Sequence, residues 1–295
     1  MNGVIVIDKP RGLTSHDVVD RVRRILKQRS VGHLGTLDPS ATGVLPIVVG
    51  SLTRLAQFYL HSEKSYEGEM RFGFATDSYD ADGEPTGPVA KVNLDSSRLN
   101  ELAGEFRGVL EQMPPPFSAK KVAGVPAYKL ARKKQEVSLK PVRVEIFEFE
   151  ILGCEEEVAR FRARVGSGTY MRSVAHDLGQ KLGCGAHLAS LRRTRVAEFE
   201  VHAAHTVEEL EEAAQQGGAE ELFVHSRKLL PEFPCVTATD ENLTLIRSGR
   251  AVNLPEFSRA SKVKVFHGQG ELIAIATRVA GTLFHPGIVF GGESV

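Results

Sequence analysis

The hydrophobic positions at the start of the chain predict a strand, a helix and a second strand. Residues 3–8 form a continuous apolar run that is typical of a short buried strand. Apolar residues then recur at helical spacing after Thr14, and Asp17 three positions later predicts a capping box at the first turn of this helix. Residues 64–74 alternate with a period of two, which predicts a strand with Tyr66 on its apolar face.

The middle of the chain adds two helices and two strands. Apolar residues at helical spacing predict helices at residues 96–107 and 172–182. Residues 142–151 alternate, but the apolar phase slips by one position after Ile146, which indicates a β-bulge. Residues 158–165 alternate apolar side chains with arginines that face either solvent or a polyanion. Because strands and helices mix without strict βαβ repetition, we predict an α+β fold with a mixed, mainly antiparallel sheet flanked by helices.

Two segments depart from this pattern. Residues 113–140 contain three consecutive prolines and then basic residues without a sustained period, which predicts a long excursion from the core. After Pro234 the chain changes to short strands separated by turns, with HGQG at residues 267–270 as a hairpin. We therefore predict a larger domain of residues 1–234 and a small β-rich domain of residues 235–295.

The composition is that of an ordinary folded protein and excludes several classes. The 295 residues are 42% hydrophobic, enough for a core in each of two domains. No run approaches the roughly 20 apolar residues that span a bilayer, and no signal peptide precedes the first strand, so we expect a cytoplasmic protein. Cys154, Cys184 and Cys235 are far apart in the sequence without a C-x-x-C pair, and we expect reduced, mostly buried thiols.

The charge of the chain is balanced overall but segregated locally. The formal net charge is zero, which by itself does not indicate a polyanionic partner. Residues 118–143, however, carry eight basic side chains against the single acid Glu136. Such a run is either a solvated face or a surface for RNA phosphates, and charge alone leaves both readings open.

One carboxylate, Asp38, lies in a glycine-rich turn, GHLGTLDPSATGVLP at residues 32–46. Asp before Pro is a common turn opener, so a purely structural role is one reading. A lone acid in such a turn is also a candidate for a catalytic carboxylate. No Gly-Lys-Ser/Thr follows the glycines, which excludes a Walker-type phosphate loop.

The same turn resembles the GHxGTLDPxAxGVLP signature of the TruB-type tRNA pseudouridine synthases. Five further blocks resemble the family in the family's order: GVIVIDKPRGLTS (3–15), KSYEG (64–68), TDSYDADGE (76–84), GTYMRSVAHDLG (168–179) and LGCGAHLASLRR (182–193). Leu34, where the family often has Thr, and Arg54, where Lys is frequent, are departures that we expect to adjust RNA contacts. The resemblance implies the pseudouridine synthase fold, with a PUA-like C-terminal domain whose role is either RNA binding or packing between domains.

The resemblance also implies a set of site residues. Asp38 is the catalytic carboxylate, and Arg172 pairs with it so that it stays ionised, since burial alone would raise its pKa. Tyr66 and Tyr170 pack against the target base or its ribose, and Leu191 meets the uracil edge. From residue type alone Arg172 could instead pair with Asp177 or solvent, Tyr66 or Tyr170 could be a core aromatic, and Leu191 a core leucine.

Further contacts to the substrate follow from the same resemblance. His33 is expected to contact RNA near the flipped nucleotide, and Lys9 to bind the substrate. The insertion at residues 113–140 is expected to be a mobile RNA-binding lobe. The residues expected at the RNA backbone are Lys120, Lys121, Lys129, Arg132, Lys133, Lys134 and Arg54.

The implied activity is isomerisation of uridine to pseudouridine at position 55, in the T loop of tRNA, after the base is flipped out of its stack. It requires no cofactor, no metal and no obligatory protein partner, and a monomer is expected. Asp38 either attacks the nucleoside or removes a ribose proton, and the sequence does not choose between these routes.

Three other functions are weighed against this one. They are a guide-RNA-dependent synthase of the dyskerin type, a tRNA-folding chaperone with secondary catalysis, and a metal-dependent hydrolase using His16, His33 and Asp38. No basic tail or long N-terminal extension favours the first of these. No ligand spacing supports the metal site of the third.

Overall fold

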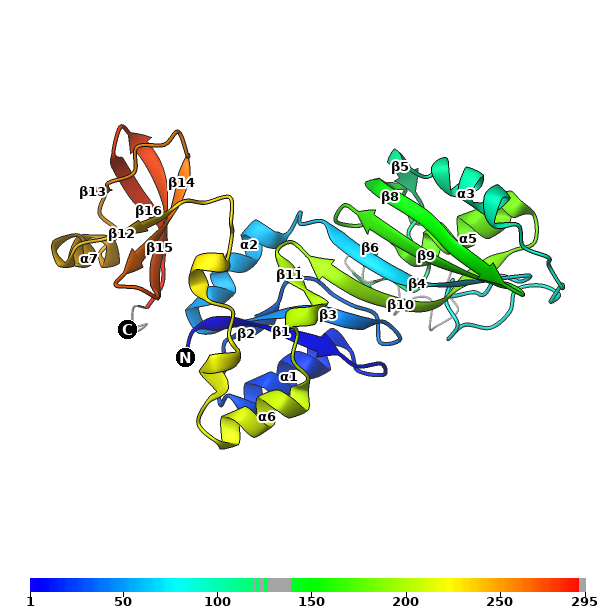
Figure 1. Cartoon of the computed structure of the whole chain (residues 1–295), viewed down its shortest axis with the longest axis horizontal. Coiled ribbons are helices and arrows are strands. Elements are labelled where there is room, and N and C mark those ends of the chain that lie inside the picture. The colour runs from blue at the N-terminus through cyan, green and yellow to red at the C-terminus, as the bar shows by residue number, and fades with distance from the viewer. Residues whose placement is uncertain (119, 123–124, 127–138, 292–295) are drawn as a thin grey trace.

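The main sheet is mixed and mainly antiparallel, as predicted (Figure 1). The computed structural model describes residues 1–118, 120–122, 125–126 and 139–291 of the chain. The central strands follow one another across the sheet in the order β1 (Gly3–Lys9), β3 (Thr42–Val49), β10 (Ala186–Val196), β4 (Lys64–Phe72), β9 (Val158–Val165), β8 (Val142–Glu155) and β5 (Gly108–Gln112). Two short strands, β2 (Val31–His33) and β11 (Phe199–Glu200), pair with β3 and β10. Strands β3 and β10 run parallel, and the other neighbours along this path run antiparallel.

Helices cover the two halves of this sheet separately (Figure 1). Apolar side chains of α1 (Ser15–Ile25) and α6 (Val207–Gln215) pack with β1 and β3 in one core. Those of α3 (Ser96–Gly104) and α5 (Met171–Leu182) pack with β4, β8, β9 and β10 in another. The shorter helices are α2 (Ala56–Tyr59) and the 3-10 turns η1 (Gly50–Leu55), η2 (Val201–Ala203), η3 (Ala219–Leu222) and η4 (Ser226–Lys228).

Local sequence signals account for the details of several elements. The Thr14 hydroxyl accepts a hydrogen bond from the Asp17 amide at 3.0 Å, and Asp17 Oδ2 accepts one from the Thr14 amide at 2.8 Å, which confirms the capping box of α1. The β8–β9 register shifts between Ile146 and Glu148, which confirms the predicted bulge. On β9 the apolar positions are buried, while the Arg162 and Arg164 side chains form ion pairs with glutamates at the surface.

The parallel contact between β3 and β10 depends on a glycine. Gly43 pairs with Arg193 and has a φ of +100°, in the left-handed region that favours glycine. A Cβ at Gly43 would lie 2.2 Å from the Arg193 carbonyl oxygen, so only glycine allows this approach. The contact fixes Arg193 beside the turn that carries Asp38.

The C-terminal part of the chain folds as the β-rich unit that was predicted. Its sheet has the order β12 (Cys235–Thr237), β14 (Lys262–His267), β15 (Glu271–Ala280), β16 (Leu283–Val289) and β13 (Val252–Asn253), and α7 (Asp240–Arg247) covers it. The predicted hairpin at residues 267–270 joins β14 to β15. The sequence pattern did not predict β12 or α7. The boundary at residue 234 stays a prediction.

Other expectations need correction or fall outside the described residues. Cys235 is exposed and Cys154 and Cys184 are half-buried, so the expectation of mostly buried thiols was wrong. Part of the expected excursion forms a small hairpin, β6 (Lys121–Val122) with β7 (Val125–Pro126). The predicted RNA contacts at Lys129, Arg132, Lys133 and Lys134 lie outside the described residues. Within the described part of the chain no helix is long and apolar enough to span a membrane.

Candidate active site

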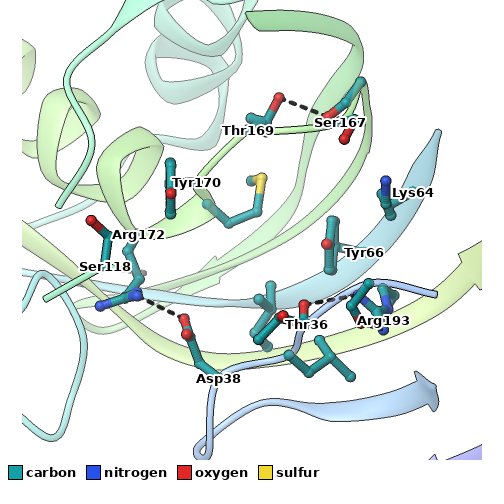
Figure 2. A pocket seen from close by; sticks show the side chains of 16 residues that line it. Thr36, Asp38, Lys64, Tyr66, Ser118, Ser167, Thr169, Tyr170, Arg172 and Arg193 are labelled. Carbon is teal, nitrogen blue, oxygen red and sulfur yellow. Dashed lines mark hydrogen bonds and ion pairs between the residues drawn. The ribbon is translucent and has the colours of Figure 1, made fainter. Parts of the chain in front are cut away.

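A cavity of about 300 Å³ opens beside the Asp38 turn (Figure 2). It lies between this turn, the start of β4, the segment that leads into α5, and β10. The lining includes five residues that the sequence singled out for chemistry: Asp38, Tyr66, Tyr170, Arg172 and Leu191. These residues come from four separate motif blocks, and the fold brings them to one place.

Asp38 and Arg172 form an ion pair across the floor of this cavity. Arg172 Nη2 lies 2.9 Å from Asp38 Oδ2, and the arginine side chain is 7% exposed whereas that of Asp38 is 41% exposed. Arg172 lies in the first turn of α5, where Tyr170 is the N-cap residue. The Asp38 carboxylate offsets the cost of burying this guanidinium, and the pairing through Oδ2 leaves the other carboxylate oxygen of Asp38 for a ligand in the cavity.

A second carboxylate, Asp80, completes the environment of Arg172. Arg172 Nη1 lies 3.4 Å from Asp80 Oδ2. The guanidinium also donates to the carbonyls of Ser78 at 3.3 Å and Phe117 at 3.0 Å. Burial raises the pKa of Asp80, while the hydrogen bond from Ser78 and the charge of Arg172 act against that shift.

Asp80 was not predicted as a site residue, although it lies in the TDSYDADGE block. The signal that could have found it was the position of this acid within a family motif. The alternative pairing of Arg172 with Asp177 is not seen, because the arginine is turned toward Asp38 and Asp80.

The aromatic side chains face the cavity from two sides. Tyr66 on β4 is 8% exposed and belongs both to the apolar core and to the cavity wall, so the two readings of this residue are compatible. Tyr170 is held through its backbone, whose amide donates to Gln112 Oε1 at 2.8 Å and whose carbonyl accepts from Gln112 Nε2 at 3.1 Å. Burial raises the pKa of the Tyr170 hydroxyl, which favours its neutral form.

Arg193 braces the turn that carries Asp38. Its guanidinium is buried and donates to the carbonyls of Val44 at 2.7 Å, Gly35 at 3.0 Å and Thr36 at 3.2 Å. Arg193 was not predicted as a site residue, although it ends the LGCGAHLASLRR block. The bonds to Gly35 and Thr36 satisfy carbonyl groups in the loop just before Asp38, and the bond to Val44 ties this loop to β3.

Lys9 lies outside the residues that line the cavity, and its expected contact with the substrate stays a prediction. Lys9 is 0% exposed, and its Nζ donates to the carbonyls of Leu13 at 2.7 Å, Pro10 at 2.9 Å and Pro39 at 3.3 Å. Its ammonium therefore ties the end of β1 to the residue that follows Asp38. Burial lowers the pKa of Lys9 to about 8, so the contact has an electrostatic cost, which these carbonyls offset.

His33 and Arg54 lie outside the residues that line the cavity. His33 ends β2, and its Nδ1 accepts a hydrogen bond from the Gly35 amide at 3.2 Å. Burial, and then the charges of Arg193 and His16, lower the pKa of His33 and favour its neutral form. Arg54 donates to the Val289 carbonyl at 2.9 Å, which links η1 to the C-terminal sheet.

The remaining predicted contacts are distributed over the surface. Lys120 is exposed, and Lys121 lies in β6. His16 pairs with Asp20 at 3.5 Å on the exposed face of α1. Over the described ranges no group of three or more His, Cys, Asp or Glu side chains is arranged to hold a metal ion. The roles of Lys120 and Lys121 toward RNA stay predictions.

Comparisons with known proteins agree with the motifs. The family model of the TruB pseudouridylate synthase N-terminal domain matches residues 23–171, and that of the tRNA pseudouridylate synthase B C-terminal domain matches residues 172–231. The chain is 52% identical over 292 residues to tRNA pseudouridine synthase B of Solibacter usitatus (strain Ellin6076), covering 98% of this chain and 100% of that protein. It is 40% identical over 279 residues to tRNA pseudouridine synthase B of Aquifex aeolicus (strain VF5), covering 92% and 96%.

Two solved structures have a similar fold. A chain in the crystal structure of a Cbf5–Nop10–Gar1 complex is 26% identical to this one, with a TM-score of 0.69 over 99% of this chain and 84% of that chain. A chain of an H/ACA RNP bound to a substrate RNA containing 2′-deoxyuridine is 24% identical, with a TM-score of 0.72 over 99% and 86% of the two chains. The latter likeness concerns the fold alone.

Proposed function

Because this chain belongs to the TruB family of pseudouridylate synthases, we propose that it converts uridine to pseudouridine at position 55 in the T loop of tRNA. One observation carries the proposal: Asp38, half-exposed and paired with a buried arginine, faces the same cavity as Tyr66 and Tyr170. A carboxylate beside aromatic walls is an arrangement suited to a reaction on a single nucleoside.

The reaction breaks the bond between N1 of uracil and C1′ of ribose and forms a bond from C5 to C1′. The proton lost from C5 is balanced by the proton gained at N1, so the reaction requires no co-reactant. The base must first leave its stack, at a cost of a few kcal/mol that contacts in the pocket offset. The volume of the cavity, about 300 Å³, and the presence of Tyr66 in its wall support binding of a flipped base there.

Asp38 has two chemical routes in this arrangement. It either adds to the nucleoside as a nucleophile or removes a ribose proton as a base, and both routes need its ionised form. The Arg172 guanidinium is always charged and stabilises that form. Asp80 shares the same guanidinium, so it holds Arg172 in place without blocking the open edge of Asp38.

The direct test is incubation of the protein with an unmodified tRNA transcript, followed by mapping of pseudouridine at every uridine. We expect pseudouridine at position 55, formed without a guide RNA or any added protein. Product that appears only after a guide RNA or protein partner is added would favour the guide-dependent alternative. No product under either condition would contradict the proposed activity.

The predicted partners follow from this function. The T arm of tRNA is the expected RNA, and Lys120 and the basic residues that follow it are the expected phosphate contacts. We expect a monomer acting in the cytoplasm, and sedimentation at micromolar concentration measures the first of these expectations.

A further inference from the structure

Two cations lie on the side of the cavity away from the Asp38–Arg172 pair. In Figure 2, Lys64 and Arg193 are on one side of Tyr66, and Asp38 and Arg172 are on the other. All five side chains line the same cavity. The function proposed above uses Asp38, Arg172 and Tyr66, and it assigns no ligand to the other end.

Arg193 brings a positive charge into the protein without a counter-ion. Its side chain is 1% exposed, and none of the ion pairs formed among the described residues includes it. It donates to three backbone carbonyls, which are neutral groups. A buried cation that is not paired with an acid is costly, so its charge remains available to an anion in the adjacent cavity.

Lys64 is a second cation of this cavity without a carboxylate partner among the described residues. Its Nζ donates to the Ser62 carbonyl at 2.5 Å and has no carboxylate partner among the ion pairs of the described residues. Burial and then the charge of Arg193 lower the pKa of Lys64 to about 8. An ammonium has three donors, so two of them are available to a ligand.

The Lys64 and Arg193 side chains both lie next to Gly35. A Cβ at this position would lie 3.7 Å from Arg193 Nη1 and 3.9 Å from the Lys64 Cε atom. Gly35 has a φ of +135°, in the region that favours glycine. The absence of a side chain leaves this corner of the cavity accessible from the Asp38 turn.

We infer that Lys64 and Arg193 form an anion subsite that takes a backbone phosphate of the target uridine while the base lies against Tyr66. The inference rests on the proposed function, because the ligand is part of the flipped nucleotide. A phosphate is the charged group of RNA and compensates two cations, whereas a uracil carbonyl does not. Lys64 makes the direct contact, and the buried Arg193 strengthens it through its field.

A coupling experiment tests this subsite. The substrates are synthetic T-arm stem-loops in which one phosphate, 5′ or 3′ to the target uridine, is replaced by a neutral methylphosphonate. KM and single-turnover rate are measured for the unsubstituted enzyme and for Lys64→Met. We expect the methylphosphonate alone, or Lys64→Met alone, to raise KM about tenfold. The two combined should raise KM no further, because each removes the same contact between Lys64 and the phosphate.

Matched variants separate charge from packing. Lys64→Arg keeps the cation, and we expect it to retain most of the sensitivity to the methylphosphonate. Lys91→Met removes an exposed lysine outside the cavity, and we expect its effect to be the same on every substrate. Multiplicative effects of Lys64→Met and the methylphosphonate at both positions would overturn the inference and indicate a uracil contact or a structural role.

The unsubstituted enzyme gives an independent result if Lys64→Met does not fold. A methylphosphonate next to the target uridine must then raise KM at least tenfold more than one placed in the stem, and equal effects would overturn the subsite. Activity on the all-phosphate stem-loop is measured in the same series. Its absence would contradict the proposed function itself, so the two failures are distinguishable.

Discussion

Single side chains in this site serve more than one partner. Arg172 contacts Asp38, Asp80 and two backbone carbonyls at once, which leaves its guanidinium little freedom to rotate. An arginine is suited to this because its donors are fixed in a plane and its charge is permanent. A lysine could not reach two carboxylates with the same geometry, so we regard the planar fork as part of the site.

The charge of Asp177 destabilises the folded protein and has no part in the proposed reaction. It lies on α5, half-buried, and burial raises its pKa to about 6. Between about pH 4 and pH 6 the folded protein therefore binds a proton that the unfolded chain has released. The free energy of unfolding falls as the pH rises through this window, and the full cost is present above pH 6.

We predict that Asp177→Asn stabilises the protein at pH 8 and leaves it unchanged near pH 4. The expected gain at pH 8 is about 1 kcal/mol, since contact with solvent reduces the full cost of the buried charge. Thermal unfolding of both proteins across pH 4–8 measures it. Glu211→Gln, on the exposed face of α6, is the control and should show no such pH dependence. A gain that is equal at both ends of the range would show that charge is not its cause.

At the scale of elements, the sequence predicted features that depend on neighbouring residues better than features that depend on residues far apart in the chain. The capping box of α1 and the bulge after Ile146 depend on neighbouring residues, so the sequence pattern was sufficient to find both. The short elements β12 and α7 carry too few positions to show a period. The role of Arg193 and the position of Asp80 depend on partners far along the chain, which no periodicity records.

The approach of β3 to β10 is the element contact on which the site depends most directly. We predict that Gly43→Ala destabilises the protein by more than about 2 kcal/mol and lowers activity, because its Cβ would displace the Arg193 backbone. Urea unfolding and pseudouridine formation on tRNA measure the two effects.

Gly217→Ala is the matched control for this substitution. Gly217 also has a positive φ, of +79°, but a Cβ there would meet no atom within 4 Å. We expect this variant to lose about 1 kcal/mol from backbone conformation alone and to keep its activity. Equal losses in the two variants would show that the β3–β10 contact is not what makes Gly43 necessary.

At the scale of the whole molecule, the C-terminal sheet packs against the synthase part through an apolar core. Phe266 and Phe290 share a buried cluster with Leu55 and Tyr59. The buried Lys264 donates to the carbonyls of Leu229 at 2.5 Å and Arg227 at 2.9 Å. These contacts support a packing role for this unit, and its contact with RNA stays a prediction.

The chemistry also depends on the whole molecule, because residues far apart in sequence form the cavity. Family motifs predicted Asp38, Tyr66, Tyr170, Arg172 and Leu191 as site residues, and the fold brings these five to one cavity. Lys9, in another motif block, is buried and donates to backbone carbonyls, and its contact with the substrate stays a prediction. Motifs indicate which residues a site requires. The structure is needed to show which of them line the cavity and which hold other residues in place.

The central claim is that the Asp38 carboxylate carries out the reaction in this cavity. The most direct measurement compares the unsubstituted protein with Asp38→Asn, scoring both tRNA binding and pseudouridine at position 55. The amide keeps the size of the side chain and removes its charge, so we expect binding within about threefold and a rate lowered by at least about 10⁴-fold. Pseudouridine formed by Asp38→Asn at a rate near that of the unsubstituted protein would contradict the account.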